Sequence, residues 1–252
     1  SEMCIRDRVT ELKWSDVSRD ASSRNSNASL DQSWDFATPK IGLNWTPSEN
    51  QRWYANISRS HEAPPFWEIV VGQVPPTAPA QATASLTELN VQRATTYEIG
   101  GQGRIGSNEW SLSLYHSDVD DELISTSDSL GVRVGTYNYA SRTRHRGVEA
   151  GIKGLLPTSA TLGGDLAYRL AWTFSDFTFR GGEFEGNQIA GVPRQLWAGE
   201  LLYRRGPWSI GPNLRWLPQD TPTDHANTRN NYQDSYAPVS YTHLRAHETG
   251  RN

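Results

Sequence analysis

Thiols are nearly absent from this chain of 252 residues, which has one cysteine, Cys4, beside its one methionine, Met3. A disulfide framework or a thiolate metal site needs several cysteines, so both are excluded, and the shortage suits an exported protein. Lysine is also scarce: it occurs only as Lys13, Lys40 and Lys153, and arginine supplies the other basic residues. The formal net charge of -4 argues against nucleic acid as the main partner, because nucleic-acid-binding domains present a basic face.

Long apolar runs are missing too. The longest is residues 69–71, Ile-Val-Val, far short of the roughly 18 residues that a membrane-spanning helix needs. An all-helical membrane protein is therefore excluded. Disorder is also excluded as a description of the whole chain, because ten Trp, ten Tyr and six Phe give it many side chains that bury well.

The two ends of the chain differ from the rest. Residues 1–8 and residues 239–252 resemble translated sequencing-adapter read-through, and the only Met and Cys fall inside the first of them. We expect these two segments to be non-native and to pack on nothing, like expression scars. Residues 9–238 are then an internal fragment of a longer protein; the alternative is that both segments are ordinary termini.

The dominant sequence pattern has a period of two. In residues 162–174, LGGDLAYRLAWTF, large apolar residues and Gly164 occupy the even positions, and small or charged residues occupy the odd ones. Strict alternation is typical of a β-strand with one apolar face, whereas a helix would scatter the charges onto the apolar stripe. The same alternation recurs in residues 41–45, 53–58, 97–105, 110–115, 147–153 and 208–216.

Strand length and loop length together favour a membrane barrel. The alternating segments approach the roughly 9–11 residues that a tilted strand needs to cross a bilayer, longer than the usual five or six in soluble sheets. Short connections at residues 46–50, 106–108, 156–159 and 205–207 alternate with long ones at residues 60–93, 126–136, 179–193 and 218–236. Outer-membrane barrels combine short periplasmic turns with long extracellular loops in this way. We predict an all-β, antiparallel, up-and-down transmembrane β-barrel, present only as an open partial barrel of about 9–10 strands, with residues 34–217 forming one curved sheet.

The alternation also predicts which side chains face lipid. In a barrel the convex face is apolar and the concave face is polar. The convex set comprises Trp110, Leu112, Leu114, Leu166, Leu170, Trp172, Ile210 and Leu214. The concave set comprises Tyr54, Asn56, Glu98, Arg104, Glu149, Asp165, Arg169, Asn213 and Arg215.

Several motifs follow one another at strand-sized spacing. They are residues 38–43 (TPKIGL) with 54–64 (YANISRSHEAP), residues 95–100 (TTYEIG), residues 146–149 (RGVE) and residues 186–194 (GNQIAGVPR). In this order they resemble the C-terminal part of the barrel of a TonB-dependent outer-membrane receptor, over nearly all of residues 9–238. Residues 212–228 are similar to ferric-siderophore and ferric-citrate-type receptors.

The resemblance implies a barrel of about 22 strands with an N-terminal plug, in the outer membrane of a Gram-negative cell. Substrate would bind from outside, and TonB would remodel the plug to import a scarce nutrient, here a ferric siderophore or another iron chelate. The plug and the TonB box are absent from this chain, so TonB would act through the missing N-terminal part. No cofactor is implied. Two alternatives remain open: a passive porin or adhesin-type outer-membrane barrel, and a soluble β carbohydrate-binding domain.

The sequence offers no catalytic or metal motif. No Ser-His-Asp elbow, phosphate loop or carboxylate pair is present, so we expect no enzyme and no catalytic residue. Residues 61, 116, 145 and 225 are histidines without ligand spacing to one another, so no metal ligands are assigned. Residues 118–122 (DVDDE) lack the Gly and distal Glu of a calcium loop and are interpreted as the solvated outer end of a strand.

Two groups of candidate contact residues remain. Arg142, Arg144 and Arg146 share the parity of the apolar positions that follow them, so we expect them to face outward toward lipopolysaccharide phosphates; the alternative is that they grip an anionic chelate. Ligand contacts are expected on loop tips or in the upper lumen, and the candidates are His61, Phe66, Trp67, Asn187, Gln188 and His225. The expected partners are outer-membrane lipid and lipopolysaccharide, TonB, and a small-molecule metal chelate, with no nucleic acid.

Overall fold

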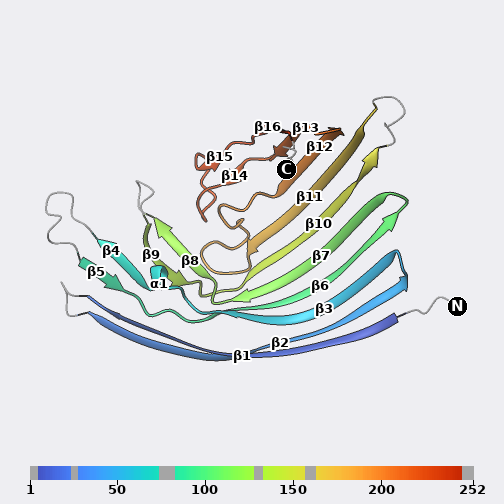
Figure 1. The fold of residues 1–252 in the computed structure, drawn as a ribbon. Helices are drawn as coiled ribbons and strands as arrows, with labels where there is room; N and C mark the ends of the chain where they lie inside the picture. The colour runs from blue at the N-terminus through green and yellow to red at the C-terminus, as the bar shows by residue number, and fades with distance from the viewer. Residues whose placement is uncertain (1–4, 24–27, 74–82, 128–132, 157–162, 246–252) are drawn as a thin grey trace, which may run out of the picture.

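Ten long antiparallel strands form one curved sheet (Figure 1). The computed structural model describes residues 5–23, 28–73, 83–127, 133–156 and 163–245. The long strands are β1 (Ile5–Ser22), β2 (Ser29–Ser48), β3 (Gln51–Glu62), β6 (Gln92–Ile105), β7 (Asn108–Asp120), β10 (Thr143–Leu156), β11 (Asp165–Phe179), β12 (Gln195–Arg205), β13 (Trp208–Trp216) and β16 (Val239–Arg245). They are ordered β1-β2-β3-β6-β7-β10-β11-β12-β13-β16, so each long strand lies beside the next one along the chain. This is an up-and-down sheet, and within the described residues β1 and β16 remain its two open edges.

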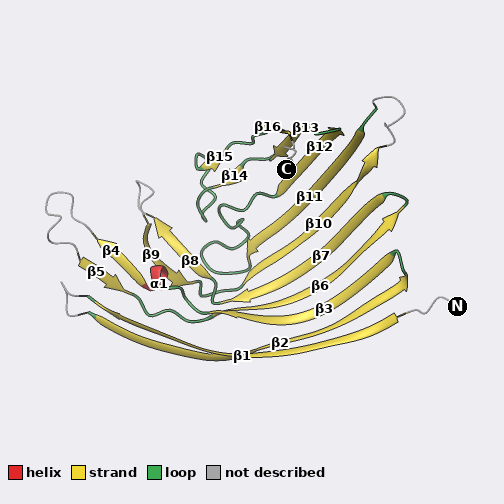
Figure 2. Ribbon diagram, viewed as in Figure 1, coloured by secondary structure: helices red, strands yellow, loops and turns green. Residues whose placement is uncertain are grey.

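Shorter elements occupy the long connections, and Figure 2 shows that strands dominate the molecule. They are α1 (Phe66–Ile69), β4 (Val70–Gln73), β5 (Thr83–Leu86), β8 (Leu123–Ser127), β9 (Arg133–Asn138), β14 (Thr221–Pro222) and β15 (Tyr232–Gln233). β4–β5, β8–β9 and β14–β15 are separate two-stranded hairpins that the period-two pattern did not predict. In the described part of the chain, no helix has the length and apolar character needed to cross a membrane.

The turns at the other ends of the long strands are short, as the sequence predicts. β6 and β7 are joined through Gly106, and β12 and β13 through Gly206. These glycines have φ values of 60° and 56°, a left-handed conformation that glycine adopts without steric penalty. Two-residue hairpin turns favour such positive φ values because they match the twist of the flanking strands.

Strand pairing confirms that the alternation separates two faces. Paired residues of an antiparallel sheet project to the same side, and one row across five strands contains Ala55, Ile99, Leu114, Val148 and Phe174. A row on the opposite face contains the charged or polar residues Arg104, Glu109, Lys153, Arg169, Glu200 and Asn213. The predicted apolar and polar sets fall on these two faces without exception.

The polar face is the concave one. Phe177 and Phe179 share the alternate positions of Arg169 on β11, and Phe179 contacts His225 in the connection after β13. That connection lies within the curve of the sheet (Figure 1). The apolar face is therefore convex and solvent-accessible in the isolated chain, where Leu170 is 53% exposed and Leu214 is 38% exposed.

Two apolar cores lie among the loops rather than on the convex face of the sheet. One contains Ile124, Tyr139, Phe179 and Ile189, and the other contains Leu30, Ile69 and Leu89. Neither includes Trp172 or Leu214, so the described residues form no packed apolar core of the kind that a soluble β domain requires.

The expectation that both ends pack on nothing is wrong for the described residues. Residues 5–8 pair with residues 43–46 of β2, and residues 239–245 pair with residues 208–214 of β13. Backbone pairing explains this, because an alternating segment beside an open sheet edge can add a strand whatever its origin. Residues 1–4, with Cys4, and residues 246–252 lie outside the described part. The non-native origin of residues 1–8 and 239–252 stays a prediction, because strand pairing does not depend on origin.

Candidate functional site

The outer loops bring together three of the predicted ligand residues. Asn187 and Gln188 lie in the connection between β11 and β12, and His225 lies in the connection after β13. The Asn187 Nδ2 donates to the His225 carbonyl oxygen at 3.0 Å, and the Ala190 N–H donates to His225 Nδ1 at 3.2 Å. The two loops therefore form one hydrogen-bonded surface, called here the loop network (residues 187–190 and 224–231).

Asp224 and Asn227 organise the loop network, and neither was identified from the sequence. Asp224 accepts from the Thr228 N–H at 2.9 Å and from Asn231 Nδ2 at 2.6 Å. Burial of this carboxyl raises its pKa, but the hydrogen bonds from Thr228, Asn231 and Asn227 outweigh burial, so the pKa lies below its usual value. The local signal is an Asp followed at short spacing by Asn and Thr, a pattern that closes loops through side-chain-to-backbone bonds.

The loop network packs against a group of aromatic side chains. Tyr139 packs edge-on to Phe179 and stacks on Phe184, and His225 contacts both phenylalanine rings. Burial among these rings lowers the pKa of His225 below that of a free imidazole, with Glu122 and Asp224 opposing the shift. Nδ1 of the neutral ring accepts from Ala190, so the arrangement holds His225 uncharged.

A second contact ties the β8–β9 hairpin to the same loop. Tyr137 of β9 donates its hydroxyl to Glu183 Oε1 at 3.1 Å. Burial, followed by the bond to Glu183 and its charge, raises the pKa of Tyr137 to about 12. The tyrosine therefore stays protonated and acts as a donor over the physiological pH range.

The other three predicted ligand residues lie apart from the loop network. His61 stacks on Phe36 with ring centroids 4.9 Å apart, at the outer end of β3. Phe66 and Trp67 are exposed on α1, beside the β8–β9 hairpin in Figure 1. The structure thus brings Asn187, Gln188 and His225 together and leaves His61, Phe66 and Trp67 outside that group, and a ligand role for any of them stays a prediction.

The acidic segment 118–122 does end a strand, as interpreted, but the interpretation of it as solvated is wrong for Val119 and Glu122, which are buried. β7 ends at Asp120, Asp121 has a φ of 56°, and Glu122 turns into the structure. Glu122 accepts from the Thr143 hydroxyl and lies 3.3 Å from His145 Nε2. The segment therefore anchors the start of β10 through buried polar contacts.

The concave face carries a polar network at mid-height. Glu98 accepts hydrogen bonds from Tyr54 at 2.7 Å, from Ser113 at 3.0 Å and from Asn56 at 3.1 Å. Ser113 is paired across strands with Glu149, so two carboxylates share this region of the concave face. A charge-assisted network of this kind fixes the carboxylate position and leaves acceptor capacity directed into the curve of the sheet.

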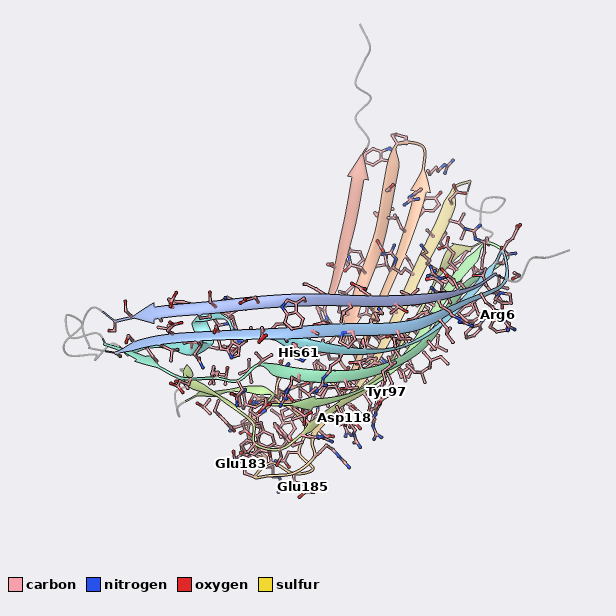
Figure 3. The ribbon with its side chains drawn as sticks, turned by 90° about the horizontal axis from the view of Figure 1, so that it is seen from below. Arg6, His61, Tyr97, Asp118, Glu183 and Glu185 are labelled. Carbon is pink, nitrogen blue, oxygen red and sulfur yellow. The ribbon has the colours of Figure 1, made fainter. Side chains whose placement is uncertain are left out.

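The predicted outward arginines lie at the outer end of the convex face. Arg144 and Arg146 are on β10 and belong to the rows immediately beyond the Val148 row. Arg142 precedes β10 rather than continuing its alternation, and its Nε donates to Asp120 at 2.7 Å. The Asp120 carboxylate raises the pKa of Arg142 through this bond. Figure 3 shows that the Arg144 row lies at the loop end of the strands. Asp118, which is paired with Arg144, lies closer than Tyr97 to the loop that carries Glu183 and Glu185. Arg6 lies at the opposite end of the strands.

The family model described as "TonB dependent receptor-like, beta-barrel" matches residues 10–245. The chain belongs to this family. TonB-dependent receptors are transporters of the Gram-negative outer membrane and are not enzymes. Family membership sets aside the porin and soluble-domain alternatives. It also places the apolar convex face against lipid and the polar concave face in the lumen.

Solved structures share the fold. The ferric citrate transporter FecA in its unliganded form is 16% identical, with a TM-score of 0.72 over 94% of this chain and 35% of that one. The copper transporter OprC is 14% identical, with a TM-score of 0.69 over 96% of this chain and 38% of that one. The ferric yersiniabactin uptake receptor FyuA from Yersinia pestis is 15% identical, with a TM-score of 0.66 over 94% of this chain and 35% of that one. This chain therefore spans somewhat more than a third of the length of these structures.

Proposed function

We propose that this chain is part of a receptor for the energised uptake of a scarce nutrient, and that the nutrient is a ferric siderophore or another iron chelate. The observation that carries the proposal is the family match over residues 10–245 combined with a polar lumen face below a loop network. The transporters with similar folds are described as handling ferric citrate, ferric yersiniabactin and copper, which favours a metal chelate as the substrate class.

The open sheet supports the part-barrel proposal. In lipid, unpaired backbone N–H and C=O groups cost several kcal/mol each, so spanning sheets close into barrels. In the described residues, β1 and β16 each have one neighbour in the sheet. Further strands from the same receptor would continue the sheet beyond β1 and, because residues 239–245 are predicted to be non-native, beyond β13 in place of β16. This is in keeping with the limited share of the solved transporters that this chain covers.

The lumen face supports a plug. Glu98 and Glu149 present carboxylates toward the lumen. Nearer the short turns, Arg104 and Lys153 both pair with Glu109, at 3.4 and 2.9 Å, and Arg169 adds a further basic group. Mixed charge inside a barrel requires water or polar partners. A plug domain in a segment outside this chain would supply those partners, and TonB would act through that segment.

The loop network is the proposed outer contact surface for the chelate. Asn187 and Gln188 each donate one side-chain N–H within the loops, to the His225 and Val192 carbonyl oxygens, and each amide keeps a second N–H and its oxygen for a ligand. His225 supplies an imidazole that burial keeps neutral, with Nε2 left beside the Ala190 bond at Nδ1. Neutral donors and acceptors on a preorganised loop can bind the oxygen atoms of a chelate without a large desolvation penalty. Phe66 and Trp67 are exposed aromatic groups on a neighbouring loop and are proposed as secondary contacts.

The test is uptake by the complete receptor that carries these strands. It is expressed in Gram-negative cells that lack their own iron receptors, and radiolabelled iron is supplied as citrate, hydroxamate or catecholate chelates. One chelate should support uptake that disappears when TonB is deleted. The variant Asn187→Ala with Gln188→Ala should raise the half-saturating concentration about tenfold, as expected for the loss of one or two neutral hydrogen bonds.

The matched control is Gln219→Ala, an exposed residue of the connection after β13 that lies outside the loop network and for whose side chain no hydrogen bond is seen among the described residues. It should leave uptake unchanged. Chelate entry that persists without TonB would contradict energised uptake and favour a passive channel. Unchanged saturation in the Asn187 and Gln188 variant would move the contact surface away from the loop network.

A further inference from the structure

We propose that three arginines on the lipid-facing side bind a phosphate group of lipopolysaccharide. The site, called here the arginine cluster, comprises Arg144, Arg146 and Arg194 around Asp176. It differs from the loop network in face and in ligand. The inference depends on the chain being an outer-membrane barrel and is independent of which nutrient the receptor imports.

The three guanidinium groups converge on one carboxylate. Arg146 Nε donates to Asp176 Oδ2 at 2.6 Å, Arg144 Nη2 donates to the same oxygen at 3.4 Å, and Arg194 Nη2 donates to Asp176 Oδ1 at 3.3 Å. The Asp176 side chain is only 8% exposed, whereas those of Arg146 and Arg194 are 52% and 50% exposed. The carboxylate thus lies beneath two accessible guanidinium groups and fixes their positions.

Positive charge is in excess at the arginine cluster. One carboxylate balances three permanently charged groups, and each guanidinium carries five N–H donors. The described contacts of Arg146 and Arg194 engage one donor group each, while the buried Nε of Arg144 has no acceptor among the described residues. Phosphate oxygens suit such donors, because guanidinium and phosphate form paired, charge-assisted hydrogen bonds.

The height of the cluster matches the lipid headgroups. Outward along β11, the convex positions run from Leu170 through Trp172 and Phe174 to Asp176. Trp172 stacks on Trp197 of β12 with ring centroids 5.6 Å apart, forming an aromatic belt. Aromatic belts mark the interface between hydrocarbon and headgroups, so Asp176, the convex position beyond Phe174, lies at the height of the lipid phosphates.

The neighbouring convex side chains do not neutralise the cluster. His116 is paired with Arg146, and Asp118 is paired with Arg144. Asp118 lies 3.6 Å from His116 rather than in contact with the arginines. Farther out, Asp120 is engaged by Arg142 and Asp121 by Arg93. These pairs are mixed in charge, which leaves the group around Asp176 as a local excess of positive charge.

The test measures lipid binding to the complete receptor in detergent by native mass spectrometry, with added Kdo2-lipid A. The variant Arg146→Gln with Arg194→Gln removes both exposed guanidinium groups and keeps Arg144 as a partner for Asp176. Its affinity should fall about 30-fold, as expected for two basic residues near a lipid surface. Arg104→Gln makes the same type of change on the lumen face and should leave affinity within about twofold.

Two further comparisons decide what is bound. Lipid A that lacks one of its phosphates should bind the unaltered receptor more weakly, and phosphatidylglycerol binding should be unaffected by the double substitution. The proposal fails if the folded double variant binds Kdo2-lipid A like the unaltered receptor. It also fails if Arg104→Gln weakens binding equally, or if phosphatidylglycerol binding falls in parallel.

Discussion

Asn227 binds the backbone of Gln188 at both of its polar groups. Its Nδ2 donates to the Gln188 carbonyl oxygen at 2.8 Å, and its Oδ1 accepts from the Gln188 N–H at 2.8 Å. The side-chain amide thereby takes the place of a neighbouring β-strand. Asn227 has a φ of 52°, a left-handed conformation that asparagine tolerates better than most residues. One side chain therefore joins two loops that are separated by 39 residues.

Replacement of Asn227 should weaken the contact between the two loops. In Asn227→Ala both bonds to Gln188 are lost and the left-handed conformation becomes less favourable, so the loop contact should weaken by about 1–3 kcal/mol. Hydrogen exchange at the Gln188 amide should accelerate, while the amides of β11 keep their protection. The control is Asn230→Ala, at an exposed residue for which no hydrogen bond to Gln188 is seen. Unchanged exchange at Gln188 in the Asn227 variant would show that the loops are joined by other contacts.

Acid should release the same loops through His225. Its pKa in the structure lies below the usual value of about 6.5, because burial disfavours the charged ring. The open loop therefore takes up a proton at a higher pH than the packed loop does. Packing is fully stabilised above the usual pKa and weakens as pH falls toward the lowered one. Exchange at the Ala190 amide, measured from pH 7.5 to 5 and corrected for intrinsic rates, should rise with acidification.

The variant His225→Asn provides the control for this acid response. Asparagine retains an acceptor oxygen but does not titrate in this range. Protection of Ala190 in the variant should be insensitive to pH. A persistent acid response would assign the titration to another group.

Adjacent positions on β11 should differ in how strongly a new charge destabilises the barrel. Leu170 lies on the convex face and Ala171 on the concave face. Leu170→Arg should destabilise the folded barrel by about 1–3 kcal/mol, because the position faces lipid between the bilayer centre and the interface at Trp172, whereas Ala171→Arg should have little effect because it faces the lumen. Unfolding of both variants by urea in lipid vesicles measures the difference. Equal destabilisation would contradict the assigned faces.

Gly211 should be intolerant of any side chain. A Cβ atom at this position would lie 1.7 Å from the Leu201 carbonyl oxygen on β12, a backbone atom that cannot move aside without breaking strand pairing. At Gly199, by contrast, the nearest atom to an added Cβ is Cδ2 of the Leu170 side chain, at 3.3 Å. Gly211→Ala should therefore destabilise the sheet by more than about 1–3 kcal/mol, a typical overpacking penalty, and Gly199→Ala by less. Midpoints of urea unfolding for the two variants compare them directly.

The wall of the barrel could be predicted from the sequence because successive side chains of a strand alternate between its two faces. Alternation in residues 162–174 places the side chains of residues 165–174 of β11 on their observed faces, and the glycines at positions 106 and 206 mark observed turns. Arg142 shows where the rule ends. It shares the parity of Arg144, but strand pairing begins only at Thr143, because the chain before it turns to meet Asp120.

The loop network could be predicted only in part. The resemblance and the loop position identified Asn187, Gln188 and His225, but no period in the sequence connects them to Asp224 or Asn227. Their contacts depend on how two irregular loops pack against each other. Loops lack the repeating geometry that allows the faces of a strand to be predicted from the sequence. The same limit applies to the arginine cluster, where parity predicted Arg144 and Arg146 but gave no sign that Arg194 would join them.

The two apolar cores lie in the loops and at the outer ends of the strands, while the convex wall has its large apolar residues exposed. The molecule is thus adapted to two different solvents. Lipid stabilises the wall, so its sequence is constrained by the membrane at nearly every convex position. The loops carry cores of their own and are stabilised by water-driven burial like small soluble proteins. Loop sequences can therefore change, and substrate recognition with them, while the spanning strands remain as they are.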